Sequence, residues 1–214
     1  MNTDRKRSTP WLITLMHEHF HQLQYAQPGY QEAVQALGLS HGDTSGMWML
    51  NYDFPYSDPD IADRFSRLRD LLVAAVQAPD GTPLEKLANN YANERQVFLA
   101  HLKDDDRKYF SFQVWQEGIA RYTEIKAAEA SKEHHPSKEF AALADFDSFG
   151  GLAGRARPET LTELQRADLR KWKRTAFYSF GAMEGMLLDR IHPHWKEQYF
   201  RNLLSLDAAF SHPL

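Results

Sequence analysis

The sequence predicts a mainly α, compact helical fold in which residues 1–214 form a single domain. Helical patterns of apolar residues follow one another along the chain and are separated by capping and breaking signals. No segment shows a sustained period of two with turn residues on both sides, as a strand would. The hydrophobic fraction of 43% and the charged fraction of 25% are ordinary for one folded domain, which excludes intrinsic disorder of the whole chain.

The first quarter of the chain predicts two helices and an ordered loop. Ser8-Thr9-Pro10 supplies a capping hydroxyl and a proline suited to a first turn, so a helix begins there and ends near Tyr25. A short helix then runs to Leu37 and stops at Gly38. Residues 39–57 hold glycines, prolines and aromatic residues without a period, and we expect this loop to form a wall of a cleft.

Clear start signals mark the helices of the middle of the chain. Asp58-Pro59 begins a helix that ends near residue 78, and Thr82-Pro83-Leu84-Glu85 combines a capping box with a proline at the first helical position. That helix should end near Lys103. Three aspartates at 104–106 suit the N-terminus of the next helix, which extends to about Ala130.

Fewer signals mark the last third. A short helix is expected around residues 140–143, and the glycine-rich segment 150–154 is predicted to be a mobile loop. A long helix should run from Pro158 to about Ile191, with Gly181 as the candidate interruption, before a short helix over 195–204.

Composition excludes several classes of function. The net charge is −4 and no basic block is present, so nucleic acid is not an expected partner. The longest unbroken apolar run, Leu71 to Val76, is too short for a membrane span. No signal peptide is recognised over Met1–Arg7, which predicts a cytoplasmic protein for the chain as it stands and an exported one if the true N-terminus lies upstream. Because there are no cysteines, any metal must be held by His, Asp or Glu.

One motif in the first expected helix predicts metal chemistry. His17-Glu18-His19-Phe20-His21 matches H-E-x-x-H. Residues four apart lie about 40° apart on one helix face, so both imidazoles can reach one ion. Glu18 lies about 100° further round, where it can reach a water bound to that ion and act as its general base. Apolar residues on the opposite face lead us to expect a buried helix, with His19 as a hydrogen-bonded core histidine.

A later helix offers the third protein ligand. Glu117 is followed by Gly118 and Ala120, whose small side chains allow the close helix approach that a carboxylate needs to reach a metal held elsewhere. Glu124 lies seven residues on, on nearly the same face. It is an alternative ligand, or it orients a histidine of the site.

These two segments together resemble a known family. H-E-x-x-H followed by W-x-E-G-x-A-x-Y is similar to the gluzincins, the zinc metallopeptidases that include thermolysin and aminopeptidase N. The resemblance implies that His17, His21 and Glu117 bind Zn²⁺ and that Glu18 activates the water. It covers about two dozen residues of 214.

The chain also departs from the family pattern. About 95 residues separate His21 from Glu117, a wider spacing than in the best-known members. Arg121 stands where thermolysin-type sites carry an acidic residue, so Glu124, Asp189 or a backbone carbonyl must hold the histidine N–H. Only about nine residues precede the first helix, too few for the upstream β-sheet that holds substrate in thermolysin-like folds. Either the protein is a reduced helical form with a different substrate-binding surface, or the chain lacks an N-terminal part.

Tyr178 is the candidate for stabilising an oxyanion near the metal, because its hydroxyl can donate a hydrogen bond. Gly181, Ala182 and Gly185 flank it as a strip of small residues, against which another helix can pack tightly. The alternative is a buried tyrosine with a packing role only. His192 and His194, at a helix end, are expected to interact with the helix dipole.

The sequence thus predicts a zinc-dependent hydrolase acting on a peptide or protein substrate. One alternative is a catalytically silent binding domain that keeps zinc for stability. The other is a di-metal carboxylate bundle, for which Glu18-x-x-His21 would need Asp189-x-x-His192 as its second half.

Overall fold

The computed structural model describes residues 7–211, and over this range it contains helices and no strand, which confirms the helical fold class. Met1–Lys6, over which the search for a signal peptide falls, lies outside the described residues. The elements in order are α1 (Ser8–Tyr25), α2 (Tyr30–Ala36), α3 (Trp48–Asn51), α4 (Pro59–Gln77), α5 (Thr82–His101), α6 (Asp104–Gln113), the π-helical turn η1 (Val114–Gly118), α7 (Ile119–Ala130), α8 (Lys138–Ala141), α9 (Phe149–Arg166), α10 (Leu169–Trp172), the 3-10 turn η2 (Lys173–Thr175), α11 (Ala176–Ile191), α12 (Trp195–Tyr199) and η3 (Asp207–Phe210). No helix within this range has the length and apolar content that crossing a membrane requires.

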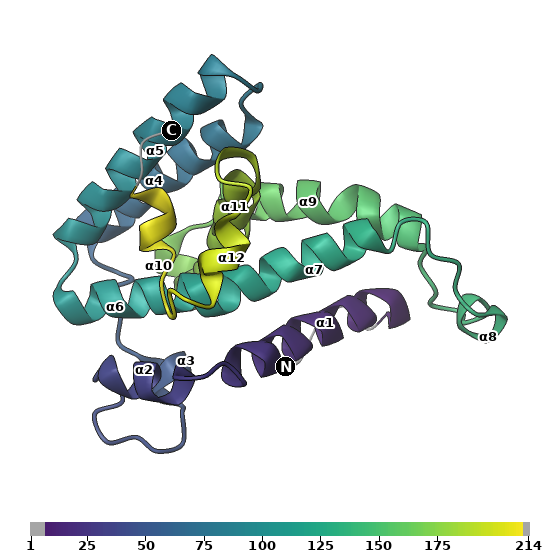
Figure 1. Cartoon of the computed structure of the whole chain (residues 1–214), viewed down its shortest axis with the longest axis horizontal. Helices are drawn as coiled ribbons and strands as arrows, with labels where there is room; N and C mark the ends of the chain where they lie inside the picture. The colour runs from purple at the N-terminus through teal and green to yellow at the C-terminus, as the bar shows by residue number, and fades with distance from the viewer. Residues whose placement is uncertain (1–6, 212–214) are drawn as a thin grey trace.

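The elements α6, η1 and α7 follow one another as a single rod through the molecule (Figure 1). Helix α11 packs on η1 and α7, α9 packs on α7 and α11, and α1 lies along α7. The α4–α5 pair packs on α11 and closes the core on another side. The buried stripe of α4 shows why: Phe65, Leu68 and Leu72 recur at helical spacing and are fully buried.

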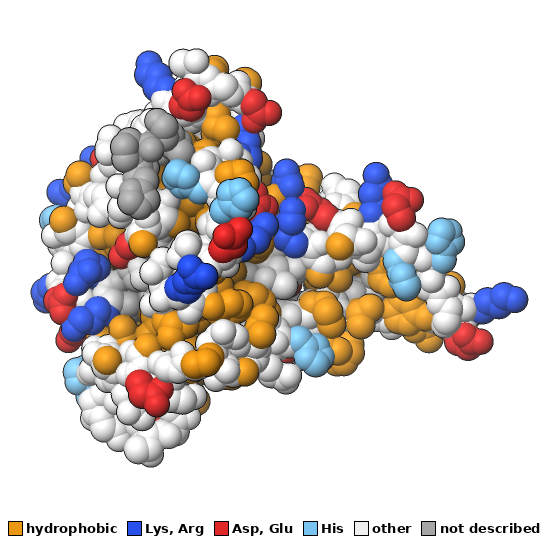
Figure 2. All heavy atoms as spheres, in the orientation of Figure 1, with side chains coloured by type: hydrophobic (Ala, Val, Ile, Leu, Met, Phe, Trp, Pro, Cys, Tyr) orange, Lys and Arg blue, Asp and Glu red, His pale blue; other side chains and the backbone are white. Residues whose placement is uncertain are grey.

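Helix α1 buries the face that carries His17 and His21 and leaves the opposite face partly in solvent. Trp11 is 55% exposed and Leu23 47% exposed, so the expected burial of this helix holds for one face only. The expectation for His19 was wrong, because His19 lies on the exposed face. Its neighbour Phe20 packs against the core, whereas Trp11 and Leu23 do not, and hydrophobic side chains are visible at the surface along α1 (Figure 2).

Two boundary predictions in the last third were also wrong. Residues 150–154 are not a loop but the first turns of α9, where the Ser148 hydroxyl accepts a hydrogen bond from the Gly151 N–H and caps the helix. Packing on α7 and α11 outweighs the low helix propensity of the glycines. The predicted long helix is interrupted at residues 167–175, between α9 and α11. Gly181 lies inside α11 and Pro158 inside α9.

The loop over residues 39–57 is ordered as expected, but its aromatic side chains pack into the hydrophobic core. Trp48 stacks on Phe112 at a centroid distance of 5.5 Å, and Phe54 meets Phe177 edge-on at 5.5 Å. None of its residues lines the cavity beside His17 that is described below. The expected wall of the cleft is formed by α9 instead.

A glycine contact fixes how α11 crosses the central rod. A Cβ atom on Gly181 would lie 2.6 Å from the Cα of Gly118 and 2.8 Å from the Val114 carbonyl oxygen. One on Gly185 would lie 2.7 Å from the Tyr122 ring. The predicted tight packing of this small-residue strip is therefore present. Gly118 makes its close approach to α11, however, and not to the helix that carries the histidines.

We predict that Gly181→Ala destabilises the protein by about 1–3 kcal/mol or more, because backbone atoms block the added methyl group. Gly154→Ala is the matched control. Gly154 is also inside a helix, a Cβ there meets nothing within 4 Å, and the change should stabilise by about 0.5–1 kcal/mol. Urea denaturation measures both. Equal stability of Gly181→Ala and the parent protein would contradict the crossing described here.

Candidate metal centre

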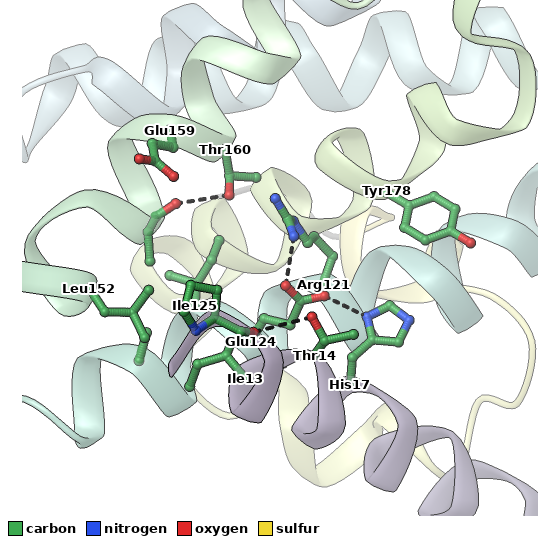
Figure 3. A pocket seen from close by; sticks show the side chains of 13 residues that line it. Ile13, Thr14, His17, Arg121, Glu124, Ile125, Leu152, Glu159, Thr160 and Tyr178 are labelled. Carbon is green, nitrogen blue, oxygen red and sulfur yellow. Dashed lines mark hydrogen bonds and ion pairs between the residues drawn. The ribbon is translucent and has the colours of Figure 1, made fainter. Parts of the chain in front are cut away.

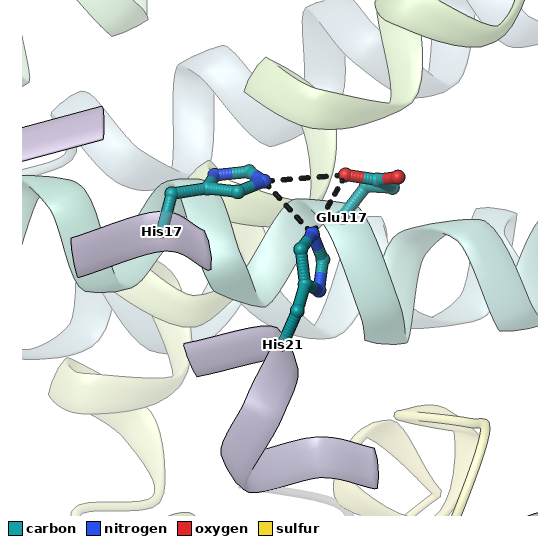
Figure 4. A group of neighbouring side chains, drawn as sticks. All are labelled: His17, His21 and Glu117. Carbon is teal, nitrogen blue, oxygen red and sulfur yellow. Dashed lines mark hydrogen bonds and ion pairs between the residues drawn. The ribbon is translucent and has the colours of Figure 1, made fainter. Parts of the chain in front are cut away.

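Three side-chain atoms from two helices converge on one point in the core (Figure 4). His17 Nε2 and His21 Nε2 lie 2.9 Å apart, and Glu117 Oε2 lies 3.3 Å from the former and 3.2 Å from the latter. All three residues are buried. Bonds of about 2.0–2.2 Å to a tetrahedral zinc ion would place neighbouring ligand atoms about 3.3 Å apart, so the donor set fits such an ion.

Hydrogen bonds at the far side of each ring fix which nitrogen faces the centre. His17 Nδ1 lies 2.8 Å from Glu124 Oε1, and a carboxylate only accepts. His21 Nδ1 lies 2.7 Å from Gln24 Oε1. The Gln24 amide nitrogen faces the carbonyl oxygens of Trp115 and Gln116, so its oxygen must face His21. Both rings therefore carry hydrogen on Nδ1 and, when neutral, point Nε2 lone pairs at each other.

Such a cluster requires a cation. Two imidazole lone pairs and a carboxylate oxygen at these distances have no hydrogen to share between them when the rings are neutral. An unpartnered buried acceptor costs about 1–3 kcal/mol, and three together approach the total stability of a domain, about 5–15 kcal/mol. A divalent metal ion would satisfy all three, and a proton on one imidazole satisfies them in part.

The electrostatics of the metal-free protein show the same demand for positive charge. Burial alone would lower the pKa of His17, but the hydrogen bonds and charges of Glu117 and Glu124 outweigh it and raise this pKa from 6.5 to about 9. Burial alone would raise the pKa of Glu117, whereas His17 and His21 hold it well below its usual range. The carboxylate is therefore ionised and attracts a cation at the position that the two rings share.

The π-helical turn η1 carries Glu117, and the side chain of Gln24 on α1 donates hydrogen bonds to its backbone. Turns of this kind interrupt α-helices most often at functional sites, because they widen the helix and re-aim its side chains. The Gln24 amide lies 3.2 Å from the Trp115 carbonyl oxygen and 3.1 Å from that of Gln116, both within η1. Gln24 thus joins the widened turn to His21 and sets the two helices in register.

Glu124 orients His17 and is itself held by Arg121. Arg121 Nη1 donates to Glu124 Oε2 at 2.6 Å, and its Nη2 donates to Glu163 of α9 at 3.1 Å. Of the two roles that the sequence left open for Glu124, the structure shows the orienting one. Arg121, which departs from the thermolysin pattern, supports this carboxylate.

The structure places one of the two predicted catalytic side chains, Tyr178, beside the centre, and leaves the other, Glu18, without a hydrogen bond to it. The Tyr178 ring stacks on His17, with centroids 6.0 Å apart and 9° between the planes. Burial and the charge of Glu117 raise the pKa of Tyr178 above its usual value, so its hydroxyl stays protonated. Glu18, the neighbour of His17, has one buried carboxylate oxygen without a hydrogen-bond partner. This orphaned acceptor is suited to a ligand or water beside the metal position.

Arg174, which the sequence analysis did not single out, reaches the same centre. Its Nη1 donates to the Tyr178 hydroxyl oxygen at 2.6 Å and lies 3.4 Å from Glu117 Oε1. It follows Lys173, whose φ of 48° places a non-glycine residue in the left-handed region. No spacing in the sequence singles it out, because the interruption between α9 and α11 is seen only in the structure.

Of the alternatives for holding a histidine N–H, the structure shows Glu124 on His17, and Asp189 has other partners. Its carboxylate accepts hydrogen bonds from Tyr122 and Trp195 and pairs with Lys196. Within residues 7–211 the structure gathers one group of potential metal ligands, and Asp189 and His192 are not part of it. The second half of a di-metal site is therefore missing from the described residues.

No family model, curated protein or solved structure matches this chain. The likeness to gluzincins consequently rests on the two short motifs and on the residues that they bring together.

We predict that Glu124→Gln weakens zinc binding about 10–100-fold, because His17 loses the carboxylate that orients its ring. Isothermal titration calorimetry on metal-free protein measures the affinity. Glu163→Gln is the matched control, since Glu163 contacts Arg121 and makes no hydrogen bond to either histidine. Equal losses in the two variants would assign the effect to Arg121 rather than to the orientation of His17.

We also predict a pH dependence of stability for the metal-free protein. The pKa of His17 is raised on folding from 6.5 to about 9, so its contribution to the free energy of unfolding is fully present below pH 6.5. That contribution, on the order of a few kcal/mol, is lost as pH rises to about 9. Urea denaturation in chelator across this range measures it. His17→Gln should flatten the profile, and an unchanged slope would contradict the assignment.

Proposed function

We propose that this protein is a zinc-dependent hydrolase that cleaves amide bonds of peptide or protein substrates. The observation that carries the proposal is the convergence of His17, His21 and Glu117, with Glu18 adjacent to the first of them on α1. Two imidazoles and one carboxylate leave a fourth tetrahedral position open for water, as catalytic zinc sites do. When bound, zinc lowers the pKa of such a water to about 7.

Glu18 serves as the proton carrier. Its buried carboxylate oxygen has no hydrogen-bond partner, so it is available to accept a proton from the attacking water. The same carboxylate then passes this proton to the amine that leaves. Its place next to His17 in the chain keeps it near the metal, while its different helix face keeps it from being a ligand.

Tyr178 and Arg174 stabilise negative charge on the substrate. The Tyr178 oxygen accepts a hydrogen bond from Arg174, so the single hydroxyl hydrogen must point to another acceptor. The stacking of its ring on His17 supports a role for this donor near the proposed metal position. A carbonyl oxygen that becomes an oxyanion there would receive the hydrogen bond.

We predict that Glu18→Gln retains zinc but loses hydrolysis by about 10²–10⁴-fold, because the amide cannot take up the proton. Zinc is measured by elemental analysis after dialysis, and turnover by mass spectrometry of a mixed peptide library. His19→Gln is the matched control, since His19 is the exposed neighbour on the same helix and should change neither quantity. His17→Ala should lose both.

Each outcome of this experiment has a definite meaning. One equivalent of zinc with no turnover dependent on Glu18 would leave a zinc-stabilised binding domain and remove the enzyme. No zinc at all in the parent protein would remove the metal centre itself.

A further inference from the structure

A cavity of about 290 Å³ lies beside the metal centre, between α1, α7 and α9 (Figure 3). His17 and Tyr178 form its inner end, and the exposed residue Glu159 lies among its lining residues. Its apolar lining comes from all three helices and includes Ile13, Ile125, Ala128, Leu152 and Ala156. Its volume is near the lower limit of ligand pockets, about 300 Å³, so it suits one side chain better than a large molecule.

Most polar side chains of the cavity are already paired within the protein, although the buried Nε of Arg121 has no hydrogen-bond partner. The hydroxyl of Thr14 donates to the Pro10 carbonyl oxygen, and that of Thr160 donates to the Ala156 carbonyl oxygen. Glu124 is shared between His17 and Arg121, so its charge is compensated. A polar occupant would find few free partners there, whereas an apolar one would lose nothing and gain burial.

The position of the cavity relates it to the chemistry. An occupant would touch the ring of His17, whose Nε2 belongs to the proposed metal centre, and the ring of Tyr178, the proposed oxyanion donor. Only the width of an aromatic ring would therefore separate a group held there from the atoms that would react. Figure 3 shows these two rings at one end of the cavity and Leu152 and Ile13 at the other.

Resting on the hydrolase function proposed above, we propose that this cavity binds one large apolar side chain of the substrate, Leu, Ile, Met or Phe, next to the cleaved amide bond. Ala128 and Ala156 leave the space open, because larger residues at these positions would extend into it. Burying a side chain of this size is favourable enough to set a preference of about tenfold among peptides.

The test compares matched peptides that differ only by Leu or Ala beside the cleaved bond. In the parent protein kcat/KM should be at least about tenfold higher for the leucine peptide, the range that a hydrophobic pocket can provide. Ala156→Leu, which fills the cavity, should reduce that ratio to near one while zinc content stays unchanged. Ala153→Leu on the same helix is the matched control, since Ala153 does not line the cavity.

A binding measurement separates this proposal from the hydrolase function. N-acetyl-leucinamide should bind the purified Glu18→Gln protein at least about tenfold more tightly than N-acetyl-alaninamide, and Ala156→Leu in that background should remove the difference. Leucine-selective binding without any hydrolysis in the parent protein would reject the hydrolase and keep the pocket. Hydrolysis that ignores the leucine, or equal binding of both amides, would overturn the pocket.

Discussion

The convergence of two imidazole nitrogens and a carboxylate oxygen inside a helical core is the constraint on which the rest of the structure depends. When both rings are neutral, each of these atoms is an acceptor at the distances observed, and none is accessible enough for water to compensate it fully. A proton on one ring or a metal ion between the three atoms therefore removes a cost of about 1–3 kcal/mol for each acceptor. The surrounding hydrogen bonds reinforce the demand, because Glu124 and Gln24 turn the lone pairs of both rings inward.

A deformation of regular helix geometry positions Glu117, and a close backbone contact positions Tyr178. The π-helical turn places Glu117 against α1, and its carbonyl groups receive the Gln24 side chain of that helix. Directly after Glu117, Gly118 meets Gly181 of α11 at a distance that no side chain permits. Tyr178 precedes Gly181 by about one turn on α11, so the backbone contact that fixes α11 on the rod also fixes the tyrosine relative to Glu117, one of the candidate metal ligands.

The sequence predicted what local spacing decides and missed what tertiary contacts decide. Residues four apart on one helix must share a face, so the pairing of His17 with His21 followed from the sequence alone. Joining them to Glu117 across about 95 residues depended on a motif rather than on geometry. Gln24 and Arg174 could not be recognised, because neither has a distinctive spacing and each acquires its role from a partner on another helix. The glycines at 150–154 led to a wrong loop prediction for a related reason, since tertiary packing there outweighs their low helix propensity.

The orientation of α1 departs from the one that burial of apolar surface alone would favour. A surface helix ordinarily buries its apolar face and exposes its polar one. Here the buried face carries His17, His21 and Gln24, while Trp11 and Leu23 are about half exposed. Burying histidines in place of a tryptophan and a leucine forgoes about 1.5–3 kcal/mol for each apolar side chain, so stability alone would favour the opposite orientation. Violations of local rules of this size concentrate at functional sites, where a bound group compensates the polar atoms that the fold has buried.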